Sequence, residues 1–125
     1  EGNGGIIYPE LHYGRDALVG VGLFLTYLCE SQCTCSELKN KFPIYYMSKN
    51  KIQLDATTNV DEILSKIADK FKNERVTTID GVKIDFEEGW VHLRKSNTEP
   101  IIRIYSEGKT EAEAERFAQM IKESL

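Results

Sequence analysis

Hydrophobic residues in the C-terminal two thirds of the chain recur with the period of helices in some segments and of strands in others. Asn59 and a T-x-x-E capping box at Thr110 each begin a segment with apolar residues at amphipathic helical spacing. Elsewhere apolar and polar residues alternate, as in Val82, Ile84 and Phe86. The predicted order is β-α-β-β-β-β-α, an α+β domain with an antiparallel sheet and helices on one face.

Turn signals bound the predicted strands of this region. The strands are expected at residues 52–54, 76–79, 82–86, 90–94 and 101–106. Asp80 and Gly81 are the pair typical of a two-residue hairpin with a type I′ turn, and residues 87–89 predict another turn.

The segment before this region predicts a strand followed by two helices. Residues 5–8 are a short β-prone run, Asp16 is a suitable cap for an apolar helix, and Thr34 opens a capping box for a shorter one. Residues 44–47 are interpreted as a linker or edge strand. We therefore expect a remnant of an α/β domain at 1–47 and a separate C-terminal domain at 48–125.

The apolar helix is hydrophobic around its whole circumference. Its apolar run, residues 17–29, is shorter than the roughly 20 residues needed to cross a bilayer, so we expect no membrane partner. A helix that is apolar on every side needs neighbours on every side, and too few residues follow to supply them. We expect the covering layer to lie upstream of Glu1, in further domains of the same polypeptide.

Composition and charge narrow the class of protein. Sixteen Lys and Arg residues stand against twenty Asp and Glu residues, a net charge of −4, which disfavours a dedicated nucleic-acid binder. Cys29, Cys33 and Cys35 are odd in number and lack the spacing of a disulfide framework or a zinc site. This pattern predicts a reducing, cytoplasmic setting.

Residues 94–103, between two predicted strands, carry the clearest candidate chemistry. Arg94, Ser96, Asn97 and Thr98 supply hydrogen-bond donors within five residues, and Arg103 follows on the returning strand. Guanidinium groups, hydroxyls and backbone N–H groups that converge in this way suit a dianionic phosphate. The alternative is a polar hairpin whose side chains satisfy its own backbone, with the two arginines as solvated partners of Glu residues.

The string R-K-S-N-T-E-P-I-I-R at 94–103 resembles the R-x-S-[NG]-T-E-P-x-x-R signature of the α-D-phosphohexomutases, the family of phosphoglucomutases, phosphomannomutases and phosphoglucosamine mutases. Residues 1–5, E-G-N-G-G, resemble the sugar-recognition loop at the end of the third domain of that family, and residues 12–16 continue the similarity. The resemblance covers the whole chain. It implies that the C-terminal domain has a TATA-binding-protein-like fold.

The resemblance also implies an activity for the full-length protein. Members move phosphate between positions 1 and 6 of a hexose through a bisphosphosugar, using a phosphoserine on the first domain and Mg²⁺ on an aspartate-rich loop of the second. This chain has neither the D-x-D-x-D run nor the serine signature. We therefore expect no catalytic residue, no metal ligand and no cofactor bound by this segment, which should bind phosphosugar without turnover.

Site residues follow from the resemblance by position. Arg94, Ser96, Asn97, Thr98 and Arg103 are expected to hold the substrate phosphate that is not reacting. Glu1 and Asn3 are expected to hydrogen-bond sugar hydroxyls. The segment would also close over the substrate cleft.

A second class of function stays open at this point, namely an independent α+β interaction module that shares the fold and has no catalytic role. His92 is interpreted as a residue of a sheet face, because it alternates with Trp90 and Arg94. The sequence upstream of Glu1 would separate the two classes by showing whether a phosphoserine loop and an aspartate-rich loop precede it.

Overall fold

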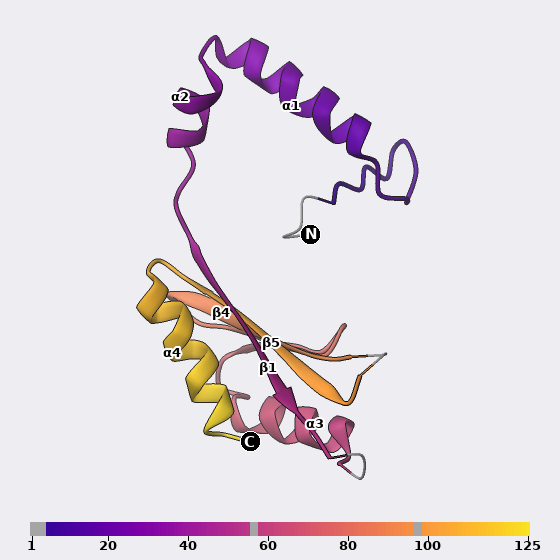
Figure 1. The fold of residues 1–125 in the computed structure, drawn as a ribbon, viewed down its shortest axis with the longest axis vertical. Coiled ribbons are helices and arrows are strands. Elements are labelled where there is room, and N and C mark those ends of the chain that lie inside the picture. The colour runs from indigo at the N-terminus through magenta and orange to yellow at the C-terminus, as the bar shows by residue number, and fades with distance from the viewer. Residues whose placement is uncertain (1–4, 56–57, 97–98) are drawn as a thin grey trace. The chain divides into compact units, whose positions relative to one another are not determined.

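The computed structural model describes residues 5–55, 58–96 and 99–125. It contains two compact units, Glu1–Pro43 and Ile44–Leu125. Elements of both units can be followed from indigo to yellow in Figure 1.

The second unit is a five-stranded antiparallel sheet with two helices, and it confirms the predicted order of elements. The strands lie in the order β1-β5-β4-β3-β2, so β5 and β4 are interior strands. Their bounds are β1 Tyr46–Gln53, β2 Arg75–Thr77, β3 Val82–Asp85, β4 Gly89–Lys95 and β5 Ile101–Gly108. The helices are α3, Val60–Lys70, and α4, Glu111–Lys122.

The hydrophobic core lies between the two helices and one face of the sheet. Alternate strand residues meet there with apolar residues from the inward sides of α3 and α4, as the amphipathic spacing requires. The buried members are Leu64, Ile67, Val82, Ile84, Val91, Leu93, Ile102, Ile104, Phe117, Ala118 and Ile121. Ser106 is buried on the same face, and its hydroxyl donates to the carbonyl of Ala114 at 2.6 Å. The opposite face of the sheet is therefore available for a site.

Both predicted helix caps of this unit are confirmed. The Asn59 side chain accepts from the backbone N–H of Glu62 at 3.3 Å. Thr110 and Glu113 form the complete capping box, each side chain accepting from the backbone N–H of the other. These bonds satisfy N–H groups that have no partner inside the helix.

Thr110→Ala should lower the free energy of unfolding by about 1 kcal/mol, because the N–H of Glu113 loses its acceptor at the start of α4. Urea unfolding followed by circular dichroism measures the change. Thr110→Ser keeps the hydroxyl and should be nearly neutral. An equal loss in both variants would contradict the capping role.

The turn between β2 and β3 differs from the prediction. Strand β2 ends at Thr77 and β3 begins at Val82, so the connection comprises residues 78–81 and is longer than two residues. A type I′ turn requires positive φ at both central residues, whereas here Gly81 has a φ of 74° and Asp80 does not. The expected type I′ hairpin is therefore wrong, although Gly81 does supply the left-handed backbone.

Strand β1 also differs, because it begins at Tyr46 and includes the polar run 48–51. Its polar residues have partners on the helix side, where Ser48 donates to Glu115 at 2.6 Å and Lys122 donates to Asn50 at 2.7 Å. The expected boundary at residue 48 thus falls inside a strand, while the compact units divide after Pro43. Polarity on an edge strand does not prevent pairing when an adjacent helix supplies polar partners.

The first unit consists of α1, Ala17–Ser31, and α2, Cys35–Asn40. Asp16 caps α1 through the N–H groups of Leu18 and Val19, and the expected capping box opens α2 at Thr34. Within the described residues 5–8 no strand forms, and Tyr8 makes only an isolated bridge with His12. A β-prone run becomes a strand only where a partner strand is present to accept its hydrogen bonds.

No residue of α1 is buried, and Leu18 is 83% exposed. The helix therefore presents apolar side chains around its circumference, as its sequence predicts. Among the helices that the structure describes, none has the length and apolar character needed to span a bilayer.

Candidate functional site

Two arginines lie side by side on the sheet face that the helices leave uncovered. Arg94 of β4 and Arg103 of β5 are direct partners in the strand register. Their neighbours Leu93 and Ile104, also partners in the register, are completely buried on the opposite face. Side chains of such a pair begin about 5 Å apart, so both guanidinium groups can reach one small anion. Like charges placed directly opposite are unfavourable unless something compensates them.

The connection between β4 and β5 begins and ends with backbone hydrogen bonds. The N–H of Ser96 donates to the carbonyl of Ile101 at 3.1 Å, and the N–H of Ile101 donates to the carbonyl of Glu99 at 2.8 Å. Ser96 therefore leaves β4 next to the two arginines. The structure brings together Arg94, Ser96 and Arg103 of the predicted set. The other predicted residues, Asn97, Thr98, Glu1 and Asn3, lie outside the described residues.

Asp80 holds Arg94 from the loop between β2 and β3. A carboxylate oxygen of Asp80 lies 2.9 Å from Nη2 of Arg94, with both side chains more than half exposed. The carbonyl of Asp80 lies 2.6 Å from Nε2 of His92, which shares the face of Arg94 because it lies two residues before it on β4. Sequence spacing could not identify Asp80 as a partner of Arg94, because the contact depends on the register of β3 against β4.

A hollow of about 370 Å³ lies beside Arg103 on the same uncovered face. It is lined by Lys49, Asn50, Lys51, Glu99, Ile101, Arg103 and Tyr105. Tyr105 and the buried Ile101 supply apolar surface, the two lysines and Arg103 supply three cationic groups, and Glu99 supplies one carboxylate. This combination suits an anionic head attached to a small ring, because the head meets cations and the ring meets apolar surface.

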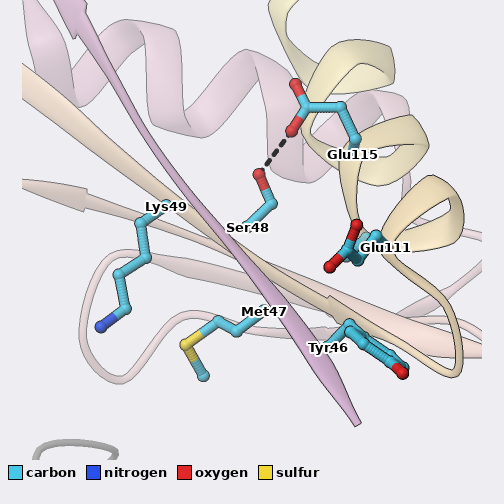
Figure 2. Close-up of a pocket in the computed structure, with 7 residues that line it drawn as sticks. Tyr46, Met47, Ser48, Lys49, Glu111 and Glu115 are labelled. Carbon is cyan, nitrogen blue, oxygen red and sulfur yellow. Dashed lines mark hydrogen bonds between the residues drawn. The ribbon is translucent and has the colours of Figure 1, made fainter.

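A second hollow, of about 470 Å³, lies where β1 meets the start of α4 (Figure 2). Glu111 and Glu115 line it together with Ser48, and Figure 2 shows Ser48 and Glu115 pointing toward each other. The hydrogen bond from Ser48, followed by the nearby charge of Lys122, holds the pKa of Glu115 below its ordinary value. A phosphate would meet two carboxylates here, so this hollow is a poorer candidate than the one beside Arg103.

The titratable side chains His12 and Cys33 of the first unit make contacts within that unit. His12 lies 3.1 Å from Asp16, whose pKa is lowered mainly by the backbone N–H of Val19 and then by His12. Sγ of Cys33 lies 3.7 Å from Nζ of Lys41 on the surface of the first unit. In the part of the chain that the structure describes, no three His, Cys, Asp or Glu side chains come together as metal ligands.

Comparison with known proteins gives the class to which this fold and motif belong. The family model described as "Phosphoglucomutase/phosphomannomutase, C-terminal domain" matches residues 49–124. The chain therefore belongs to the phosphoglucomutase/phosphomannomutase family, which confirms the family resemblance of the sequence.

Individual relatives are named as mutases of different sugar phosphates. The chain is 40% identical over 124 residues to the phosphoglucosamine/phosphogalactosamine mutase of Sulfurisphaera tokodaii, covering 98% of this chain and 27% of that protein. It is 37% identical to the phosphoglucomutase/phosphomannomutase of Thermococcus kodakarensis, covering 96% of this chain and 26% of that protein. The chain thus spans about a quarter of the length of the curated relatives that it matches.

A crystal structure of a phosphoglucomutase/phosphomannomutase family protein from Burkholderia thailandensis has the same fold. The match has a TM-score of 0.68 and 24% sequence identity, and it covers 97% of this chain and 26% of that chain. The α+β architecture predicted from the sequence is confirmed by this likeness and by the five-stranded sheet itself.

Proposed function

We propose that this chain is the C-terminal part of a phosphohexomutase that interconverts hexose 1-phosphate and hexose 6-phosphate through a bisphosphosugar. The observation that carries the proposal is the adjacent pair of Arg94 and Arg103 on the uncovered face, within a family-specific motif. Asp80 compensates Arg94 alone, and among the described residues no carboxylate lies within 4.0 Å of Arg103, so the pair is suited to an external dianion.

In this proposal the segment binds substrate and closes the cleft over it. Arg94, Ser96, Asn97, Thr98 and Arg103 hold the phosphate that is not reacting, while Glu1 and Asn3 accept or donate hydrogen bonds at the sugar hydroxyls. Holding the remote phosphate positions the opposite end of the sugar for phosphoryl transfer. A phosphoserine elsewhere in the enzyme would donate its phosphoryl group to the free hydroxyl and later take back the other one.

The described residues do not fit a magnesium site, because they bring together no set of three metal-ligating side chains. We propose that Mg²⁺ is held by other domains of the same polypeptide. The proposed partners are a phosphosugar and the other domains of the same polypeptide, and they include neither a nucleic acid nor a membrane. The proposed location is the cytoplasm.

Mutase assays of the 125-residue chain and of the whole enzyme that contains it test this proposal. The whole enzyme should convert glucose, mannose or glucosamine 1-phosphate in the presence of Mg²⁺ and a bisphosphosugar. The 125-residue chain should show no turnover under the same conditions, because binding groups alone do not supply a nucleophile. A whole protein inactive on all three substrates would favour the alternative of an interaction module, and turnover by the chain alone would contradict the division of roles.

A further inference from the structure

Three cations from three neighbouring strands form one row on the uncovered face of the sheet. Arg103 of β5 is the register partner of Arg94 on one side and of Lys51 of β1 on the other. Partner positions in an antiparallel sheet share a face. The side chain of Lys51 therefore begins about 5 Å from that of Arg103, which is the same spacing as between Arg103 and Arg94.

The face of Lys51 follows from the alternation along β1. Ser48 contacts Glu115 of α4, and Figure 2 shows Lys49 pointing away from that helix. Lys51 lies two residues beyond Lys49 and so shares its face. Lys51 and Arg103 also line one hollow, together with Glu99.

The three cations of the row differ in how they are compensated. Arg94 has its ion pair with Asp80. Among the described residues, neither Lys51 nor Arg103 has a side-chain hydrogen bond or an ion pair within 4.0 Å. Two uncompensated like charges on directly opposed positions are unfavourable in the protein alone. A bound dianion between them would reverse the sign of that interaction.

Lys49 differs from Lys51 although both lie on the same strand and face. Its Nζ lies over the ring of Tyr105 at 5.7 Å from the ring centroid, and Tyr105 is its register partner. This cation–π contact holds the ammonium group of Lys49 over Tyr105, away from the arginine pair. The row therefore extends to Lys51, which is the cation next to Arg103 on β1.

We propose that Lys51 is a further binding residue for the phosphate monoester dianion, acting beside Arg103 and Arg94. The inference rests on the proposed function, since it adds a contact to the same phosphate. It also enlarges the site, because β1 then contributes to a site that the motif alone would limit to β4, β5 and their connection. An ammonium group is a point charge and adds attraction without the fixed geometry of a guanidinium fork.

Steady-state kinetics of Lys51→Gln and Lys49→Gln in the whole enzyme, with glucose 1-phosphate, test this inference. The two variants make the same charge change on the same strand and face, two residues apart. Lys51→Gln should raise KM about fivefold to tenfold, a little below the contribution of a fully formed hydrogen bond between charged groups, and Lys49→Gln less than about twofold. Lys51→Arg keeps the charge and should restore a KM near that of the parent. Equal effects of the two glutamine variants would overturn the proposal, because they would indicate a general loss of positive charge.

A binding measurement separates this inference from the function on which it rests. Thermal unfolding of the 125-residue chain with and without inorganic phosphate should show stabilisation by phosphate that is reduced in both Arg103→Gln and Lys51→Gln. Reduction in Arg103→Gln alone would overturn the role of Lys51 and leave the proposed site intact. A stabilisation unchanged in both variants would remove the phosphate site itself. Without phosphate, Lys51→Gln should be no less stable than the parent, because a repulsion is removed.

Discussion

Arg94→Ala is expected to lower kcat/KM about a hundredfold in the phosphohexomutase that we propose contains this chain. Arg94 lies directly opposite Arg103 on the uncovered face, where a guanidinium can form a bidentate contact with phosphate. Removing one strong phosphate contact corresponds to about 2–3 kcal/mol of transition-state binding. Steady-state kinetics with glucose, mannose and glucosamine phosphates measure the loss, which should be similar for each sugar because the contact is to phosphate.

Lys95→Ala is the matched control, since it removes a neighbouring cation from the other face of the same strand. Its Nζ lies 3.2 Å from the carboxylate of Asp61 at the start of α3. The contact with Asp61 confirms that Lys95 lies on the helix-covered face, as the predicted alternation requires. In Lys95→Ala, kcat/KM should change by less than about threefold, because the lost contact is an exposed ion pair, which contributes little. Equal small effects at both positions would remove Arg94 from the site.

Leu93→Ala should lower the free energy of unfolding of the second unit by about 3 kcal/mol. Leu93 is completely buried and pairs with Val82 on one side and Ile104 on the other, so the truncation leaves a cavity in the middle of the core. Urea unfolding followed by tryptophan fluorescence can measure the change, because Trp90 lies on the same strand.

Ile79→Ala removes a comparable apolar side chain from the surface. Ile79 is 93% exposed in the loop before β3, and its truncation should change the free energy of unfolding by less than about 0.5 kcal/mol. A loss at Leu93 no larger than the loss at Ile79 would contradict the placement of the core.

Local features of the fold were predictable because their causes are close together in the sequence. The caps at Asn59 and Thr110 depend on residues three positions apart, and both helices begin where these signals place them. The sequence predicted that the strands are antiparallel but not their order in the sheet. Strands β4 and β5 are interior because β5 pairs with β1, and that pairing joins segments that are distant in the sequence.

The errors arose where distant residues override local pattern. Strand β1 extends through a polar run because Glu115 and Lys122 of α4 supply partners for Ser48 and Asn50. Asp80 and Gly81 have the composition of a tight hairpin, but the register of Thr77 with Lys83 requires a longer connection. Neither fact can be read from the residues of the segment itself.

The candidate site was predictable as far as its motif is continuous. Arg94, Ser96 and Arg103 lie within one stretch of the sequence, and the register places the two arginines directly opposite each other. Asp80 was missed because it contacts Arg94 from the loop before β3, and Lys51 because its place opposite Arg103 depends on the pairing of β1 with β5. A sheet face collects residues from several segments, and only the register reveals which ones.

The interior position of Arg103 in the sheet affects how long the backbone at this residue keeps its conformation. Its strand, β5, is hydrogen-bonded to β1 and to β4, so opening the backbone at Arg103 requires loss of pairing on both sides. Segments of this kind are among the last to exchange their amide hydrogens with solvent. The backbone beneath the guanidinium of Arg103 is therefore expected to stay in place through the local fluctuations that open surface turns, so that motion at this residue is confined to its side-chain torsions.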